Sequence, residues 1–301
     1  HSLVTRAVDP APPRCAALSL ERHDPRDGTA APVRRWLLIE QPGPWGRDAL
    51  LSSRLDGEVA VALQRRCAAA GVRPMLIRRP GRAQPATGQR WAIVDSRPGH
   101  EGSWWGVVQG AEDLLDVSLS SSSGEFSSAP SYLVCTHARH DACCAIRGRP
   151  VAAALAAVRP EQAWECSHVG GDRFAANVVV LPHGLYYGTV TTDEVPRLLA
   201  THDGGRLALD LLRGRSALAM PVQAADRYLR TALGEDRIDA VRTLSADRTE
   251  DDQWTVRFAH PGGTATVTVR AGLSTPLPRL TCAATGSQRV PVYDEVCVTL
   301  M

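Results

Sequence analysis

The feature that most constrains the fold is an order of secondary-structure patterns that occurs twice along the chain. Each copy starts with a short apolar strand, passes through a loop into a helix, and continues with three further strand patterns and the start of a second helix. The first copy is expected over residues 36–115 and the second over residues 131–195. A chain that repeats such a unit is expected to form an α/β protein with two related halves.

The first copy opens with a buried strand and a loop rich in glycine and proline. The loop covers residues 41–46. The expected elements are a strand at 36–40, a helix at 57–70, strands at 75–77, 91–94 and 105–108, and a short helix from 112.

The second copy has the same order of patterns. Its expected elements are a strand at 131–135, a helix at 145–158, a strand at 164–166, a hairpin of 176–181 with 186–190, and a helix from 193. Trp105-Gly106-Val107-Val108 and Tyr187-Gly188-Thr189-Val190 end the two copies in the same way. The order β-α-β-β-β-α is close to a thioredoxin-like core, so we predict two thioredoxin-like pseudo-repeats.

Three parts of the chain follow from this pattern. Residues 1–117 form a pseudo-repeat without ligands, residues 129–235 form the pseudo-repeat with the candidate site, and residues 236–301 form a strand-rich C-terminal extension. The serine-biased stretch 118–128 is interpreted as the linker between the first two parts. A further helix is expected at about 217–233.

Composition narrows the class of protein. The hydrophobic fraction of 44% is that of a globular chain, and a net charge of +2 gives no electrostatic footprint for nucleic acid. No apolar run reaches the roughly 20 residues that span a bilayer, so we expect a cytoplasmic protein without a membrane partner. All 34 basic residues are arginine, which indicates a GC-rich, bacterial genome.

The cysteines are concentrated in the second copy. Eight are too few for a disulfide scaffold in 301 residues, and four of them, Cys135, Cys143, Cys144 and Cys166, lie close to several histidines. Glu40 takes the place of the first of these cysteines in the other copy. One pseudo-repeat is therefore expected to be functional and the other structural.

The spacing of two cysteines places them at one edge of the sheet. Cys135 ends a predicted strand and Cys144 enters the following helix, where α/β proteins usually keep their sites. The positive end of the helix dipole would also stabilise a thiolate at Cys144. Downstream lies Cys166-Ser167-His168-Val169-Gly170-Gly171-Asp172-Arg173-Phe174.

These residues carry a family resemblance. The pattern of two cysteines with eight residues between them, followed by His-x-Gly-Gly-x-Arg-Phe, is similar to the motif of the sucrase/ferredoxin-like family, also described as thioredoxin-like ferredoxins. Residues 36–46, 164–174 and 212–215 also resemble that family, and the likeness covers about residues 30–235. The resemblance implies a [2Fe–2S] cluster with two cysteine ligands on one iron and imidazole on the other, and a redox role.

The ligand set departs from the family at one position. Cys135 and Cys144 match the two cysteines and His168 matches the first downstream ligand, whereas Asp172 stands where the family commonly has histidine. A carboxylate is harder than imidazole and unusual on a cluster. Either Asp172 binds the iron, or a neighbouring residue binds it in place of Asp172, or the iron has an open position. The neighbours considered are Cys166, Cys143, His137 and His140, with Asp172 favoured and Cys166 next.

The function that follows is electron transfer, with a reductase as donor and an unknown acceptor as redox partner proteins. Arg173 is expected beside the cofactor, where it would offset charge or hydrogen-bond a sulfide. The alternatives are a redox enzyme or sensor with a labile iron site, a structural zinc ion at the same residues, and a disulfide or two buried thiols. His183 and His202 are interpreted as surface residues, and Arg213-Gly214-Arg215 as a solvated helix end.

Overall fold

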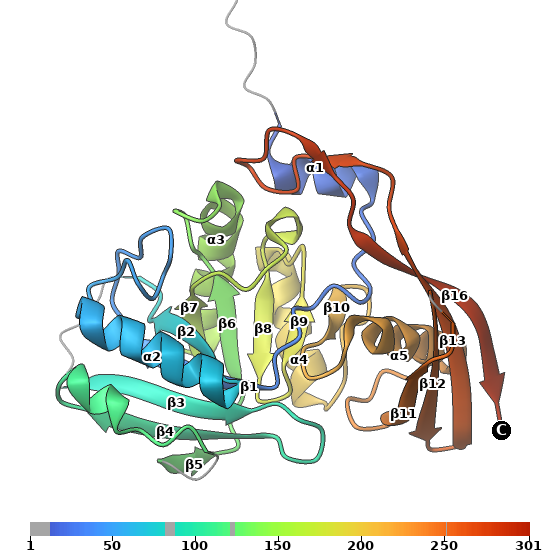
Figure 1. The fold of residues 1–301 in the computed structure, drawn as a ribbon, viewed down its shortest axis with the longest axis horizontal. Helices are drawn as coiled ribbons and strands as arrows, with labels where there is room; N and C mark the ends of the chain where they lie inside the picture. The colour runs from blue at the N-terminus through green and yellow to red at the C-terminus, as the bar shows by residue number, and fades with distance from the viewer. Residues whose placement is uncertain (1–12, 82–87, 121–123, 251) are drawn as a thin grey trace, which may run out of the picture.

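The computed structural model describes residues 13–81, 88–120, 124–250 and 252–301, and these form a mixed α/β fold (Figure 1). Its centre is a ten-stranded sheet in the order β10-β9-β8-β6-β7-β2-β1-β3-β4-β5. A four-stranded sheet and a two-stranded ribbon follow it in the chain. The predicted α/β class is confirmed.

The ten-stranded sheet consists of two halves with the same pairing pattern. In each half a parallel pair, β1 with β2 or β6 with β7, is continued by antiparallel strands, and the halves join where β2 pairs antiparallel with β7. The first half contains β1 (Arg35–Glu40), β2 (Arg73–Arg78), β3 (Gln89–Asp95), β4 (Gly102–Val108) and β5 (Glu125–Ser127). The second contains β6 (Ser131–Cys135), β7 (Ala163–Cys166), β8 (Val178–Leu181), β9 (Leu185–Tyr187) and β10 (Leu212–Arg215).

One helix covers the start of each half. Helix α2 (Gly57–Ala70) packs its apolar residues against β1. Helix α3 (Ala142–Val158) packs against β6, and α4 (Val195–Asp203) belongs to the same hydrophobic core. Both α2 and α3 begin after an aspartate whose carboxylate accepts backbone N–H groups of the first turn. Short 3₁₀ helices lie at Glu112–Leu115 (η1), Asp172–Phe174 (η2) and Thr192–Glu194 (η3).

The C-terminal strands form a separate layer on helix α5 (Met220–Leu233). Val222 and Leu229 of α5 pack on Val256, Phe258 and Val267 of the sheet. The sheet is formed by β11 (Arg242–Arg248), β12 (Gln253–His260), β13 (Gly263–Leu273) and β16 (Pro291–Leu300).

The ribbon β14 (Leu277–Pro278) and β15 (Ser287–Gln288) belongs to an arm that leaves this sheet and reaches the N-terminal helix α1 (Cys15–Arg22) (Figure 1). Arg22 Nη1 donates to the Pro278 carbonyl oxygen at 3.0 Å, and Arg279 Nη1 donates to that of Pro13 at 3.3 Å. Helix α1 and this arm therefore lie against each other beside Asp141, the residue before α3.

Some expectations need correction. Part of the predicted linker 118–128 is strand β5, which pairs with the edge of β4, whereas residues 121–123 lie outside the described residues. Arg213 belongs to strand β10 and is buried, so its interpretation as a solvated helix end is wrong. His202 is also buried, because α4 packs its ring beside Tyr132.

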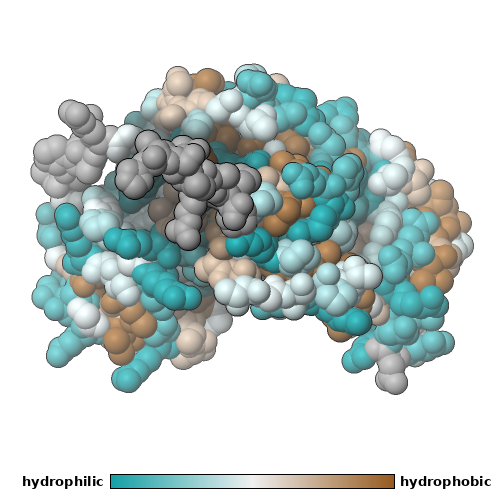
Figure 2. Space-filling view, turned by 90° about the horizontal axis from the view of Figure 1, so that it is seen from above, coloured by the Kyte–Doolittle hydropathy of each residue, from teal (hydrophilic) through white to brown (hydrophobic). Residues whose placement is uncertain are grey.

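The surface shows hydrophobic residues in several small areas rather than in one broad area on the face seen in Figure 2. Scattered apolar residues of this kind are normal on a soluble domain. Among the residues that the structure describes, no helix is both long and apolar enough to cross a membrane.

Candidate metal centre

The end of strand β6 and the start of helix α3 bring two thiols together. Cys135 is the last residue of β6 and Cys144 lies in the first turn of α3, and the two thiols lie close enough for each to shift the pKa of the other. This close approach depends on Gly148, because a Cβ atom there would lie 2.2 Å from the carbonyl oxygen of Cys135. Both cysteines are buried free thiols.

A tight turn brings His168 and Asp172 back to the same place. Gly170 and Gly171 have φ angles of +93° and +77°, which residues other than glycine rarely adopt. As a result Asp172 Oδ1 lies 3.1 Å from His168 Nδ1 and 3.2 Å from Cys144 Sγ. The pair of glycines is therefore explained by the geometry of this turn.

His140 completes the group from the loop between β6 and α3. Its Nε2 lies 3.5 Å from Asp172 Oδ2, and its ring stacks on that of His168 with centroids 3.5 Å apart. One ligand atom from each of His140, His168 and Asp172 lies within 4.8 Å of the other two. The site thus places a pair of thiols beside a group of nitrogen and oxygen donors.

The charges in this group depend on one another. The hydrogen bond from Cys144 lowers the pKa of Cys135, and the same contact raises the pKa of Cys144. Although burial lowers the pKa of His168, its contacts with Asp172 and Cys135 raise it to about 9. Burial alone would raise the pKa of Asp172, but the contact with His168 lowers it. Burial lowers the pKa of His140.

The other candidate ligands occupy different surroundings. Cys166 pairs with Cys135 across the parallel strands, and burial in the apolar core raises its pKa. His137 Nε2 lies 2.6 Å from the Gly46 carbonyl oxygen and is buried rather than solvated. Cys143 points to a separate group of residues, which is described below.

Arg173 lies next to the site but pairs elsewhere. Its Nε lies 3.3 Å from Asp24 Oδ2, and its guanidinium stacks on the ring of Phe174. Burial lowers the pKa of Arg173. The arrangement favours a role in balancing charge over direct contact with a cofactor.

The comparisons with known proteins place the chain in a family. Residues 27–214 match the family described as sucrase/ferredoxin-like. The chain belongs to this family. No curated protein matches it. Among solved structures, a match is found to a cysteine-to-serine variant of the thioredoxin-like [2Fe–2S] ferredoxin from Aquifex aeolicus, with 21% sequence identity and a TM-score of 0.24. The match covers 28% of this chain and 97% of the ferredoxin chain.

The donor set in this sucrase/ferredoxin-like chain fits a mixed-ligand [2Fe–2S] cluster. Such clusters are held by thiolates, and histidine replaces two thiolates on one iron in some of them. Cys135 and Cys144 form the thiol pair, and His168 with Asp172 or His140 forms the second pair. A mononuclear zinc ion is also compatible with these residue types.

Arg213 is a part of the site that sequence reasoning missed. It is buried, and its Nη1 donates to the Gly170 carbonyl oxygen at 2.8 Å and to Asn177 Oδ1 at 2.7 Å. A Cβ atom at Gly171 would lie 2.3 Å from its Nη2. Burial lowers the pKa of Arg213 to about 10. This cation supports the glycine turn and brings a positive charge close to Asp172.

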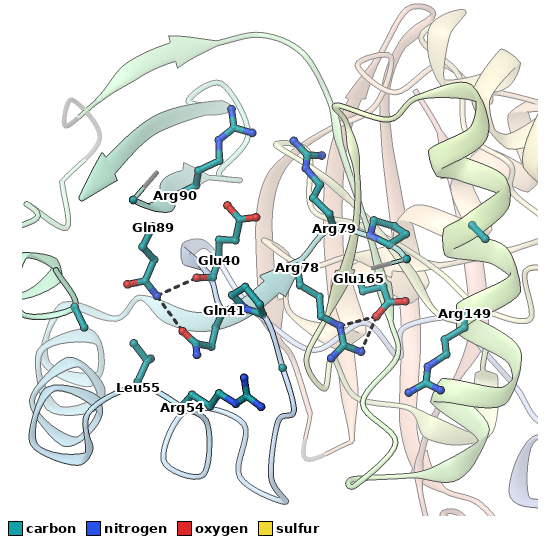
Figure 3. Close-up of a pocket in the computed structure, with 17 residues that line it drawn as sticks. Glu40, Gln41, Arg54, Leu55, Arg78, Arg79, Gln89, Arg90, Arg149 and Glu165 are labelled. Atoms are coloured by element: carbon teal, nitrogen blue, oxygen red, sulfur yellow. Dashed lines mark hydrogen bonds and ion pairs between the residues drawn. The ribbon is translucent and has the colours of Figure 1, made fainter. Parts of the chain in front are cut away.

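A large cavity lies between the loop after β1 and helix α3. It has a volume of about 960 Å³, and Figure 3 shows arginines and two glutamates around it. Glu165 links it to the candidate metal centre, because its Oε2 accepts a hydrogen bond from Thr136, the residue after Cys135. The charged residues that line the cavity are Arg54, Arg78, Arg79, Arg90, Arg149, Glu40 and Glu165.

Proposed function

We propose that this protein is an electron carrier that holds a [2Fe–2S] cluster through Cys135, Cys144, His168 and Asp172. The observation that supports the proposal is the convergence of two thiols from β6 and α3 with a histidine–aspartate pair from the glycine turn. The sucrase/ferredoxin-like family supports the same chemistry. A [2Fe–2S] cluster, when bound, supplies reversible one-electron transfer.

The two halves of the large sheet are proposed to be thioredoxin-like pseudo-repeats with different roles. Their identical pairing patterns and the matching helices α2 and α3 support this interpretation. In the first half, Glu40 stands at the end of β1, where Cys135 stands at the end of β6. The first half would therefore support the second without binding iron.

The histidine side of the site is proposed to be the edge at which electrons enter and leave. The side chains of His168 and His140 are 28% and 35% exposed, whereas Cys135 and Cys144 are buried. A reductase and an acceptor protein that dock in the cytoplasm over these rings would approach the metal closely. Arg213, positively charged and buried behind the turn, would offset the negative charge of Asp172.

A count of iron and sulfide in anaerobically purified protein tests the proposal. We expect about two irons and two sulfides per chain, with one electron taken up and released reversibly. Zinc in place of iron at Cys135 and Cys144 would instead support the mononuclear alternative. A spectrum that changes when cyanide is added would favour a labile iron site over a carrier.

The identity of the fourth ligand is tested by a matched pair of substitutions. Asp172→Ala and His140→Ala each remove one donor beside His168. If Asp172 is the ligand, the wild-type reduced cluster shows coupling to nitrogen from one histidine, and His140→Ala leaves that coupling unchanged. Coupling to two histidines, reduced to one in His140→Ala, would assign the position to His140.

A redox enzyme is the second candidate function, and the cavity favours it. Among the residues that the structure describes, arginines outnumber glutamates around it, so an anionic small molecule would suit it. Isothermal titration with inorganic phosphate and with citrate tests this function. The enzyme is favoured if the anion binds, changes the spectrum of the cluster, and no longer binds in Arg54→Gln and Arg149→Gln. If neither anion binds, the electron-carrier function is favoured.

A further inference from the structure

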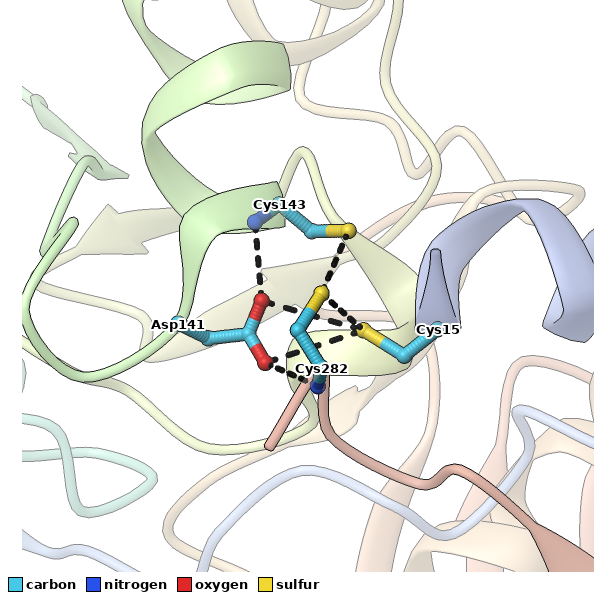
Figure 4. A group of neighbouring side chains, drawn as sticks. All are labelled: Cys15, Asp141, Cys143 and Cys282. Carbon is cyan, nitrogen blue, oxygen red and sulfur yellow. Dashed lines mark hydrogen bonds between the residues drawn. The ribbon is translucent and has the colours of Figure 1, made fainter. Parts of the chain in front are cut away.

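Three cysteines and an aspartate form a second group close to the first (Figure 4). Cys15 comes from α1, Cys143 from the first turn of α3, and Cys282 from the arm between β14 and β15. The ligand atoms of these three residues and of Asp141 all lie within 4.8 Å of one another. Residues 15 and 282 are 267 positions apart, so no local pattern brings them together.

The distances between the sulfurs suit a shared metal ion. Cys282 Sγ lies 3.3 Å from Cys143 Sγ and 3.5 Å from Cys15 Sγ. These separations are much longer than the bond of about 2.05 Å in a disulfide. Thiolates bound at about 2.3 Å to one tetrahedral ion lie about 3.8 Å apart. The sulfurs are therefore close to the spacing that a tetrahedral site requires.

Asp141 is held in place as the fourth donor. Its Oδ1 accepts from the Cys143 amide at 2.8 Å and its Oδ2 accepts from the Cys282 amide at 2.6 Å. Both oxygens also lie 3.7–3.8 Å from Cys15 Sγ. A carboxylate has about four lone-pair positions, so it retains a position for a metal after accepting these two bonds. Such hydrogen bonds to ligand residues orient them toward the ion.

The surroundings offset the negative charge that such a site collects. Cys143 lies at the N-terminal end of α3, where the helix dipole favours anions. The guanidinium groups of Arg22 and Arg173 lie near enough to Cys15 for electrostatic interaction. Three thiolates and a carboxylate around a divalent ion leave a net charge of −2, which these groups partly balance.

We propose that Cys15, Cys143, Cys282 and Asp141 bind a structural zinc ion. Four protein ligands leave no open position, which is typical of a structural rather than a catalytic site. Binding releases the protons of the three thiols. The ion would tie α1 and the C-terminal arm to the start of α3, and so fix the position of the neighbouring Cys144. The ligands of this site and those proposed for the cluster share no residue.

Zinc analysis of this chain, carried out together with the iron count, tests the proposal. We expect about one zinc per chain, with an X-ray absorption spectrum fitted by three sulfurs at about 2.3 Å and one oxygen at about 2.0–2.2 Å. This measurement on unaltered protein does not depend on the folding of any variant. Protein purified without added metal that holds no zinc and binds none on addition would overturn the proposal.

A set of substitutions assigns the zinc to these residues. Cys282→Ser and Cys15→Ser should lose the zinc and keep the iron, whereas Cys135→Ser should lose the iron and keep the zinc. Cys297→Ser, at an exposed cysteine, is the matched control and should keep both metals. Zinc retained in Cys282→Ser and Cys15→Ser, or a disulfide of Cys282 in the wild-type protein found by mass spectrometry, would contradict the assignment.

Discussion

The loops that follow β1 and β6 show how one framework supports two different sites. Both follow the first strand of a half and lead into a helix that begins after an aspartate. The end of β6, the loop after it and the start of α3 supply Cys135, His140 and Cys144 to the candidate metal centre. After β1, Glu40 and Gln41 border the arginine-lined cavity (Figure 3). The backbone pattern is shared, and the difference in chemistry lies in the side chains at the strand ends.

The difference also extends to the glycines. Gly148 of α3 allows the helix to approach the carbonyl oxygen of Cys135, whereas a Cβ atom at Gly57 of α2 would meet open space. Gly57 is the first residue of α2 and takes part in no close contact. Of these two helix glycines, Gly148 is the one that a close approach to the end of a strand requires.

The largest expected effect is loss of the iron. Cys144→Ser removes a thiol of α3, and Cys67→Ser removes a buried thiol from the corresponding helix α2. We expect the first variant to lose nearly all iron and the second to keep the wild-type content, because serine is a poor ligand for a soft cluster. Metal analysis checks this. Equal iron in both variants would show that the two helices do not differ in function.

A smaller effect is expected from filling the space at the two helix glycines. Gly148→Ala should destabilise the protein by about 1–3 kcal/mol, because the new methyl group meets the Cys135 carbonyl oxygen. Gly57→Ala should change the free energy of unfolding by less than about 1 kcal/mol. Denaturant unfolding of both variants measures the difference. Equal stability would mean that α3 does not depend on the close approach.

The smallest effect is on how the free energy of unfolding depends on pH. We expect His202, in the second half, to make the protein less stable in acid. Burial, followed by the charge of His183, lowers the pKa of His202 to about 4 from about 6.5 in the unfolded chain. Its stabilisation is therefore complete above pH of about 6.5 and is lost as the pH falls toward 4. We expect His202→Gln to remove about 1–2 kcal/mol of that pH dependence.

The control for this prediction is His23→Gln, at an exposed histidine in the left-handed C-cap of α1. The free energy of unfolding is measured from pH 7 to pH 4 for both variants. An unchanged pH dependence in His202→Gln would contradict the assignment of the acid sensitivity to that ring.

The sequence predicts those parts of the molecule that depend on local pattern. The strand before Cys135 and the helix after it follow from the pattern along the chain, whereas the set of four donors was implied by the family resemblance. The structure brings Cys135, Cys144, His168 and Asp172 together. The ligation itself stays a prediction. His140 was named only as an alternative, and its stacking on His168 depends on how the loop folds.

Other parts depend on contacts between distant segments and leave no local signal. Arg213 can be buried because hydroxyl, carbonyl and amide oxygens of Thr29, Gly170 and Asn177 accept its N–H groups. An arginine in a sequence is ordinarily expected at the surface. In the same way, nothing near Cys15 or Cys282 in the sequence indicates that α1 and the arm between β14 and β15 meet.

The second half of the molecule is proposed to hold a cluster with mixed sulfur and nitrogen ligation. Pulsed EPR of this chain after reduction with dithionite tests that ligation. We predict a rhombic signal of about one spin per chain with nitrogen coupling that disappears in His168→Asn. A protein with no such signal, or a signal without nitrogen coupling, would contradict the proposed ligands at Cys135, Cys144 and His168.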